Sequence, residues 1–306
     1  MKELQSIINH YIKNGMYPGV EWKITHKDEV FQGKAGYLNI LTEEPLLSNS
    51  LYRIWSMTKP IVSVVILQLI EEHQIKLNDA ITNYLPQFSN LKVLKNGNND
   101  IANVVDIKNM PTIEDLLLHT AGFSYNFFGD AVAREYERMG LFHSSDTTLE
   151  EEINLLSTLP LLCQPSTKWI YSVSVDVLAR IIEIVTGEGL QIQLEKRIFK
   201  PLKMFDTGFT IATQNLYRLM ASYEYNSLHK KLRKPFASPQ KISQYGYPTN
   251  KATYARGGHG LFSSLEDYSK FAQMLLTGKT KTGTTMLSDS MLKIATTNHL
   301  KSSFFP

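Results

Sequence analysis

The sequence has little of what disulfide-bonded and metal-binding proteins require. It contains one cysteine, Cys163, so neither an internal disulfide nor a cysteine metal cluster can form, and a reducing compartment is possible without being required. We expect Cys163 to be a small buried residue. The eight histidines are scattered, without the close spacing of zinc ligands. We therefore expect no metal site and no cofactor.

Long apolar runs and an excess of one charge are missing as well. The most apolar run, residues 61–70, is broken by Ser63 and Gln68. It is shorter than the about 20 residues that cross a bilayer, so it predicts a buried helix and no membrane span. With 32 basic and 29 acidic residues the net charge is +3, which is too weak to predict a nucleic-acid partner.

The N-terminus of the sequence lacks the apolar stretch of about 7–15 residues that a secretory signal needs. Residues 4–12 instead carry apolar side chains at helical spacing with polar side chains opposite, which predicts an amphipathic surface helix. We therefore expect a cytoplasmic protein. Processing of the start would leave a periplasmic or secreted location open.

The composition that is present is that of a globular protein. The chain has 306 residues, of which 43% are hydrophobic and 20% charged, and this length predicts one large domain or two interleaved ones. Residues 20–24 and 30–35 predict two strands joined at residues 26–28. From residue 77 to about residue 209 the pattern is helical with polar loops.

Capping residues predict the ends of several helices. Thr112 precedes one helix, Gly187 ends another, and Ser264 with an acidic residue three positions later predicts the start of a third. The polar segments 96–109 and 223–250 are expected to be loops.

Ser56 and Lys59 are the most informative pair of residues. Three positions apart at the head of a helix, their side chains lie on the same face and can meet. A serine hydroxyl becomes a good nucleophile when a neighbour takes its proton, and a lysine can accept that proton or assist as a cation. The start of a helix also favours the negative charge that develops in acyl transfer. The alternative is a solvated helix cap, because such pairs recur by chance.

Tyr171 is a second candidate. It lies just before the helix predicted over residues 174–185. A nearby ammonium group favours the phenolate form of a tyrosine, so Tyr171 can serve as a base. The alternative is an aromatic side chain that packs under the following helix. His119 is expected to be a hydrogen-bonding residue that closes a helix before Gly122, not a catalytic base.

Four segments in a fixed order carry a family resemblance: Ser56-Met57-Thr58-Lys59, Leu118-His119-Thr120-Ala121-Gly122-Phe123, Tyr171-Ser172 with Asp176-Val177-Leu178, and Gly257-Gly258-x-Gly260-Leu261. With these, the sequence resembles the serine β-lactamase and penicillin-binding-protein superfamily over nearly its whole length, especially class C β-lactamases and family VIII carboxylesterases. The resemblance implies that Ser56 is the acylated nucleophile, Lys59 its proton partner and Tyr171 the base.

The resemblance also implies an α/β (α+β) fold. An antiparallel sheet flanked by helices would be built from residues 1–75 and 250–306, with an all-helical domain inserted over residues 76–249 and the active site at their junction. The last strands of this β-lactamase/transpeptidase-like fold are expected to lie beyond Pro306. The oligomeric state is left open.

Val173 departs from the family pattern. Lactamases and peptidases of this kind carry Tyr-x-Asn, whose amide binds a substrate carbonyl, and a valine cannot donate that hydrogen bond. We therefore predict a serine hydrolase that acts on small esters or amides. The alternatives are a β-lactamase or D-amino-acid peptidase and, from another class, a catalytically weak binding or assembly protein that keeps the fold.

The superfamily's third motif, Lys-Thr-Gly or His-x-Gly, has two candidates. A literal Lys281-Thr282-Gly283 lies in a polar run without an apolar strand around it, so we expect a loop there. Gly258-His259-Gly260 resembles His-x-Gly but occupies the glycine turn before a helix. A structural turn is favoured, and His259 and Gly260 are kept as alternative substrate-binding residues.

Overall fold

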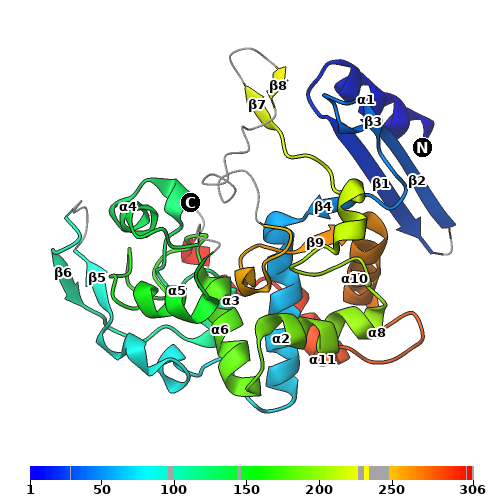
Figure 1. The fold of residues 1–306 in the computed structure, drawn as a ribbon. Helices are drawn as coiled ribbons and strands as arrows, with labels where there is room; N and C mark the ends of the chain where they lie inside the picture. The colour runs from blue at the N-terminus through cyan, green and yellow to red at the C-terminus, as the bar shows by residue number, and fades with distance from the viewer. Residues whose placement is uncertain are drawn as a thin grey trace.

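The structure is a computed structural model that describes residues 1–27, 29–95, 100–142, 146–226, 231–233, 248–300 and 302–304. It is a mixed α/β structure with antiparallel strand pairs, in agreement with the predicted fold class. Helices surround one long central helix, and a small sheet with its own helix lies to one side (Figure 1).

The N-terminal part is a three-stranded antiparallel sheet covered by a helix. The strands β1 (Gly19–His26), β2 (Glu29–Asn39) and β3 (Glu44–Pro45) lie in the order β1-β2-β3, and α1 (Lys2–Lys13) packs on β2. The Trp22 Nε1 donates to Gln5 Oε1 at 3.1 Å and so ties α1 to the sheet. The predicted surface helix and hairpin are confirmed.

A second helix, α10 (Leu265–Thr277), joins the sheet to the rest of the molecule. Lys23 on β1 forms an ion pair with Glu266, and Gln273 Nε2 donates to Thr25 Oγ1 at 3.2 Å. The helix begins as predicted, because the Ser264 side chain accepts the Asp267 N–H. The sheet is therefore flanked by α1 and α10.

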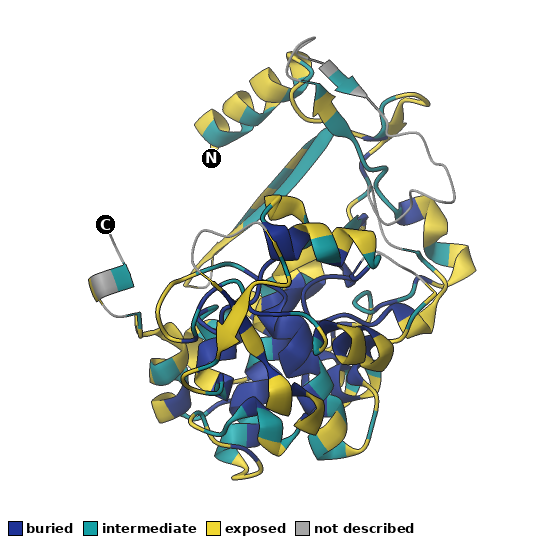
Figure 2. Cartoon of the chain, turned by 90° about the vertical axis from the view of Figure 1, so that its left-hand side faces the viewer, coloured by how far each residue is buried: buried dark blue, intermediate teal, exposed yellow. Residues whose placement is uncertain are grey.

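The core is centred on α2 (Thr58–Glu71), which lies next to α6 (Ser174–Thr186) and near α11 (Asp289–Thr296). Nine of its fourteen residues are buried, and Figure 2 shows the buried residues gathered around it. Burial of each large aliphatic side chain contributes about 1.5–3 kcal/mol, so a helix that is apolar on all sides is stable only in such a place. The prediction of a buried helix is confirmed.

The middle of the chain is mainly helical. Its other helices are α3 (Ile113–Leu117), α4 (Ala131–Arg138), α5 (Leu149–Leu156), α7 (Leu190–Leu194) and α8 (Lys200–Leu202). Thr112 and Asp115 form a reciprocal capping box at α3, and Gly187 ends α6 in a left-handed conformation, as predicted. The division of the chain at residues 75 and 250 stays a prediction.

Short strands correct the expectation of an all-helical insertion. β5 (Lys92–Leu94) pairs with β6 (Val104–Asp106), and β7 (Glu224–Asn226) pairs with β8 (Lys231–Arg233). Parts of both predicted loops are therefore strands. Segments of three residues are too short to show a strand period, which explains the error. Residues 96–99, 227–230 and 234–247 of these loops lie outside the described residues.

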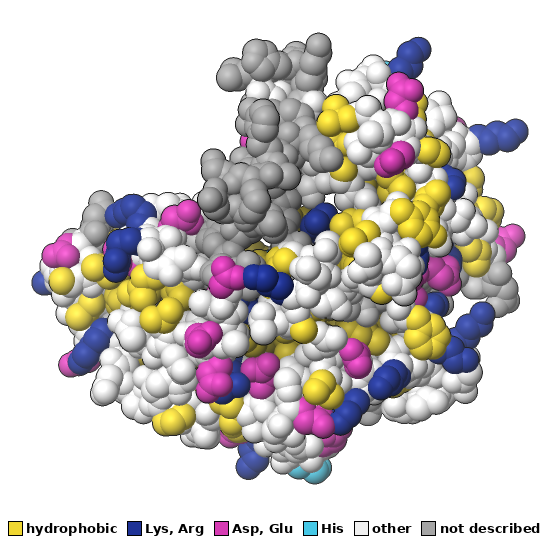
Figure 3. Space-filling model, viewed as in Figure 1, with side chains coloured by type: hydrophobic (Ala, Val, Ile, Leu, Met, Phe, Trp, Pro, Cys, Tyr) yellow, Lys and Arg dark blue, Asp and Glu magenta, His cyan; other side chains and the backbone are white. Residues whose placement is uncertain are grey.

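The surface mixes charges of both signs. On the face shown in Figure 3, acidic and basic side chains are interspersed, as the small net charge predicts. In the part of the chain that the structure describes, no helix has both the length and the apolar character needed to cross a membrane.

Candidate active site

Ser56 owes its position to the pairing of two short strands. β4 (Leu51–Arg53) lies antiparallel to β9 (Phe262–Ser264), with Arg53 opposite Phe262, and the Ile54 N–H donates to the Leu261 carbonyl at 3.0 Å. This pairing brings the residues after β4 beside the glycine turn that precedes β9. Segments about 200 positions apart in sequence thus meet at one end of α2.

The turn that carries Ser56 is strained and exposed. The 3-10 turn η1 (Trp55–Met57) leads directly into α2, and Trp55 has a φ of 45°, a left-handed value that bulky residues rarely adopt. Strained backbone of this kind tends to cluster at functional sites. Ser56 is exposed to solvent, whereas the Lys59 side chain is buried in the first turn of α2.

The three predicted catalytic residues lie together. Lys59 Nζ donates to Ser56 Oγ at 3.1 Å, and the Tyr171 hydroxyl donates to the same oxygen at 2.7 Å. Lys59 Nζ also donates to the Gly258 carbonyl at 2.7 Å and lies 4.7 Å from the centre of the Tyr171 ring. Ser56 Oγ is therefore within hydrogen-bond distance of both groups that could exchange its proton.

A row of aromatic rings runs outward from Tyr171. The Tyr171 ring stacks on Tyr125 with a centroid separation of 5.6 Å, and Tyr125 stacks on Phe127 at 4.5 Å. Phe128 follows at 4.9 Å from Phe127. Both phenylalanines are largely exposed, whereas Tyr125 is buried between its neighbours. The candidate site thus has an apolar wall on one side.

His119 supports Tyr171 from the other side. It follows the end of α3 with a φ of 57°, and the Thr120 N–H donates to the Asp115 carbonyl, which closes the helix as predicted. The Ser172 N–H donates to His119 Nδ1 at 3.2 Å. Burial, together with the Lys59 charge, lowers the pKa of His119 to about 4, so the imidazole is neutral at pH 7.

Asp176 lies beneath the site; it belongs to the segments that carry the family resemblance, but it was not predicted to be a site residue. Its side chain is fully buried in α6, and its Oδ1 accepts the Gly258 N–H at 2.9 Å. Burial raises the pKa of this carboxyl, which the Lys59 charge opposes. A carboxylate between Val175 and Val177 on the buried face of an apolar helix was the available signal, because charged residues are rarely buried without a purpose.

His259 and Gly260 lie in the turn beside the nucleophile. His259 is buried, its Nε2 is 3.1 Å from the Tyr254 hydroxyl, and its ring stacks on Trp55 with a centroid separation of 6.3 Å. Gly260 has a φ of 116°, which only glycine adopts readily. These contacts are those of a turn that supports the strained residue before Ser56. A substrate-binding role for the pair stays a prediction.

Lys281-Thr282-Gly283 lies in a tight turn after α10, as expected. The Thr280 N–H donates to the Thr284 carbonyl at 2.8 Å, and Lys279 bridges to Thr285. Gly283 has a φ of 89° and open space around its Cα. The segment is therefore a turn and not a strand.

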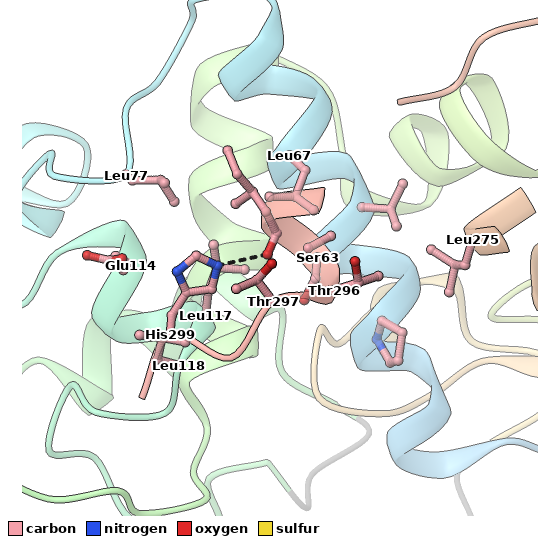
Figure 4. Close-up of a pocket in the computed structure, with 14 residues that line it drawn as sticks. Ser63, Leu67, Leu77, Glu114, Leu117, Leu118, Leu275, Thr296, Thr297 and His299 are labelled. Carbon is pink, nitrogen blue, oxygen red and sulfur yellow. Dashed lines mark hydrogen bonds between the residues drawn. The ribbon is translucent and has the colours of Figure 1, made fainter. Parts of the chain in front are cut away.

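A separate cavity of about 310 Å³ lies against another part of α2 (Figure 4). Its lining is mostly apolar and includes Ser63, Leu67, Leu117 and His299, whose Nε2 is 2.8 Å from the Ile294 carbonyl. None of the predicted catalytic residues lines it. Across the described ranges, no three His, Cys, Asp or Glu side chains come together in a way that would hold a metal ion.

The chain is similar to known proteins along nearly its whole length. Residues 4–300 match the protein family described as Beta-lactamase, so the chain belongs to that family. Protein Rv1367c of Mycobacterium tuberculosis is 28% identical over 298 residues, which cover 97% of this chain and 71% of that protein. Esterase EstB of Burkholderia gladioli is 29% identical over 190 residues, which are 61% of this chain and 45% of EstB.

Solved structures show the same fold. The structure titled "EstCE1, a hydrolase with promiscuous acyltransferase activity" has a TM-score of 0.78 at 24% identity and covers 95% of this chain and 75% of its own. Its likeness therefore extends over the sheet, the central helix and the helices of the middle region.

Proposed function

We propose that this protein is a serine hydrolase that cleaves small esters through an acyl-enzyme on Ser56. The observation that carries the proposal is the position of Ser56 Oγ, 3.1 Å from Lys59 Nζ and 2.7 Å from the Tyr171 hydroxyl. A nucleophile and its proton acceptor must lie within hydrogen-bond distance, and here two candidate acceptors meet that condition.

The proposed reaction has two steps. The reaction starts with Tyr171 deprotonated: Ser56 Oγ forms a bond to the ester carbonyl carbon as its proton passes to the Tyr171 oxygen, and the alcohol leaves with that proton when the ester C–O bond breaks. Water then attacks the acyl-enzyme, gives one proton to Tyr171, and the carboxylic acid leaves as that proton returns to Ser56 Oγ. In both steps the Lys59 ammonium stabilises the anionic phenolate of Tyr171.

The row of aromatic rings favours substrates with an apolar acyl group. Phe127 and Phe128 expose ring surface beyond Tyr125, the ring that stacks on Tyr171, and burial of apolar surface contributes about 25 cal/mol per Å². The name of EstB, an esterase at 29% identity, supports ester chemistry as well.

The composition of the tyrosine motif disfavours β-lactams. Val173 is fully buried and its backbone N–H donates to the Ser124 carbonyl, so this position offers no amide to the side-chain carbonyl of a penicillin. An unpaired buried carbonyl costs about 1–3 kcal/mol, which disfavours a β-lactam relative to a simple ester. We therefore place β-lactam or D-amino-acid peptide hydrolysis second.

The test compares Ser56→Ala with Ser63→Ala, which changes a serine of α2, the helix that follows Ser56, away from Tyr171. The assays are hydrolysis of p-nitrophenyl butyrate and labelling by a fluorophosphonate. We expect Ser56→Ala to lose turnover and labelling while keeping its melting temperature, and Ser63→Ala to keep all three. Activity that survives Ser56→Ala would refute the nucleophile assignment. A folded parent chain that neither turns over nor becomes labelled would support a binding protein.

A second assay addresses the substrate. Catalytic efficiency for p-nitrophenyl butyrate should exceed that for nitrocefin and penicillin G. Equal or higher efficiency on the β-lactams would refute the preference for esters.

A further inference from the structure

One fully buried carboxylate is linked to the nucleophile through a single residue, Gly258. Asp176 Oδ1 accepts the Gly258 N–H at 2.9 Å, and the carbonyl of the same residue accepts Lys59 Nζ at 2.7 Å. Lys59 Nζ in turn donates to Ser56 Oγ. Asp176 is therefore connected to Ser56 by three consecutive hydrogen bonds, although it touches neither the hydroxyl nor the space in front of it.

The glycine turn fits tightly over Asp176. A Cβ atom on Gly258 would lie 2.5 Å from Asp176 Oδ2 and 2.7 Å from the Tyr125 hydroxyl. A Cβ atom on Gly257 would lie 2.1 Å from the Val175 carbonyl oxygen, one residue before Asp176. Contacts this short cannot be accommodated without movement of the turn. The position of the Gly258 carbonyl, and with it that of Lys59 Nζ, is therefore set by α6.

The charge of Asp176 acts mainly on Lys59. Asp176 Oδ2 makes no hydrogen bond to a described side chain, and backbone N–H groups of the Gly257–Gly258 turn are the donors that lower the pKa of the carboxyl. Five other ionisable groups face it: Lys59 from α2, Arg256 and Tyr254 before the turn, Glu152 from α5, and Tyr125. Arg256 is 2.8 Å from Glu152 in an ion pair that is itself buried. Because Arg256 is paired with Glu152, Lys59 is the cation with which Asp176 mainly interacts.

We propose that Asp176 is a positioning residue for the reaction on Ser56. It holds the Gly257–Gly258 turn so that the Gly258 carbonyl fixes Lys59 beside Ser56, and its buried carboxylate attracts the Lys59 side chain electrostatically. This inference rests on the proposed function of Ser56, Lys59 and Tyr171. It assigns to Asp176, the third residue of α6, an effect on the rate without contact to the substrate.

Two variants separate the two effects. Asp176→Asn keeps the side-chain shape and an oxygen that accepts the Gly258 N–H, but removes the charge. Gly258→Ala keeps the charge but displaces the turn. A misplacement of about 1 Å costs on the order of 100-fold in rate, so Gly258→Ala should lower kcat for p-nitrophenyl butyrate by that factor, with KM changed by less than about twofold.

The charge effect has its own signature in the pH profile. Without the negative charge of Asp176, a positive charge at the site is less favourable. The pH of half-maximal fluorophosphonate labelling should therefore move to lower pH in Asp176→Asn and stay unchanged in Gly258→Ala. Asp267→Asn is the matched control, since Asp267 is also a buried carboxylate that accepts a backbone N–H, from Asp206 at 2.6 Å, but lies on α10. Its pH profile should equal that of the parent.

The outcomes are distinct. A parental pH midpoint in a folded Asp176→Asn would overturn the charge effect, and a parental kcat in Gly258→Ala would overturn the positioning effect. If Asp176→Asn does not fold, Gly258→Ala alone decides whether the turn controls kcat. If the Ser56→Ala variant is still labelled by the fluorophosphonate, the proposed function is refuted, and the role of Asp176 with it.

Discussion

Replacement of Tyr171 by phenylalanine tests the predicted base with a minimal change. The variant removes the hydroxyl that lies 2.7 Å from Ser56 Oγ and keeps the ring that stacks on Tyr125 and contacts His119 at 4.9 Å. The local packing should therefore survive. One hydrogen bond at a solvent-accessible site contributes no more than about 1 kcal/mol, so the free energy of unfolding should change little.

The rate should change much more. Loss of a positioned general base lowers the rate by about 100- to 10,000-fold, which is about 2.7–5.5 kcal/mol in activation free energy. The assay is steady-state hydrolysis of p-nitrophenyl butyrate together with single-turnover labelling by a fluorophosphonate. Both rates should fall, because the same proton leaves Ser56 in each reaction.

A matched control removes a hydroxyl elsewhere. Tyr84 is also a tyrosine whose hydroxyl makes a hydrogen bond, to Asp79 at 2.5 Å, but it lies in the segment between α2 and α3. Tyr84→Phe should keep the parental rate. A Tyr171→Phe variant that retained more than about one third of the parental kcat would refute the assignment of Tyr171 as the base and leave Lys59 as the proton acceptor.

Three further predictions follow from the same geometry. The unfolded chain protonates His119 near pH 6.5 but the folded chain only near pH 4, so the free energy of unfolding should decrease as the pH is lowered from 6.5 to 4. The melting temperature of His119→Asn should decrease less over this pH range than that of the parent. Phe127→Ala should lower kcat/KM for p-nitrophenyl hexanoate by about 3- to 10-fold and leave the acetate ester nearly unchanged, since an aromatic contact contributes about 0.5–1.5 kcal/mol; equal losses on both esters would refute the acyl wall. Gly257→Ala should lower the free energy of unfolding in urea by about 3 kcal/mol, because its Cβ meets backbone atoms, whereas Gly208→Ala, with its nearest contact at 3.8 Å, should change it little; similar effects of the two changes would contradict this reasoning.

Local features of the fold could be predicted from the sequence because their causes lie within a few residues. The reciprocal capping box at Thr112 depends on a side chain three residues away, and Gly187 ends α6 through its own backbone freedom. The period of residues 4–12 likewise predicted α1. The strands β5 to β8 were not predicted, because each has only three residues and is stabilised by pairing with a partner strand.

The candidate site divides in the same way. The sequence by itself determined that Ser56 and Lys59 share one face, since a helix places residues three apart side by side. Only the tertiary structure decided that Tyr171 reaches Ser56 Oγ, that the Gly258 carbonyl holds Lys59, and that Asp176 lies below that carbonyl. These contacts join residues 82 to 199 positions apart. They depend on the pairing of β4 with β9 and on the packing of α2 against α6, and no local pattern encodes the distance between two segments that meet only when the whole core has formed.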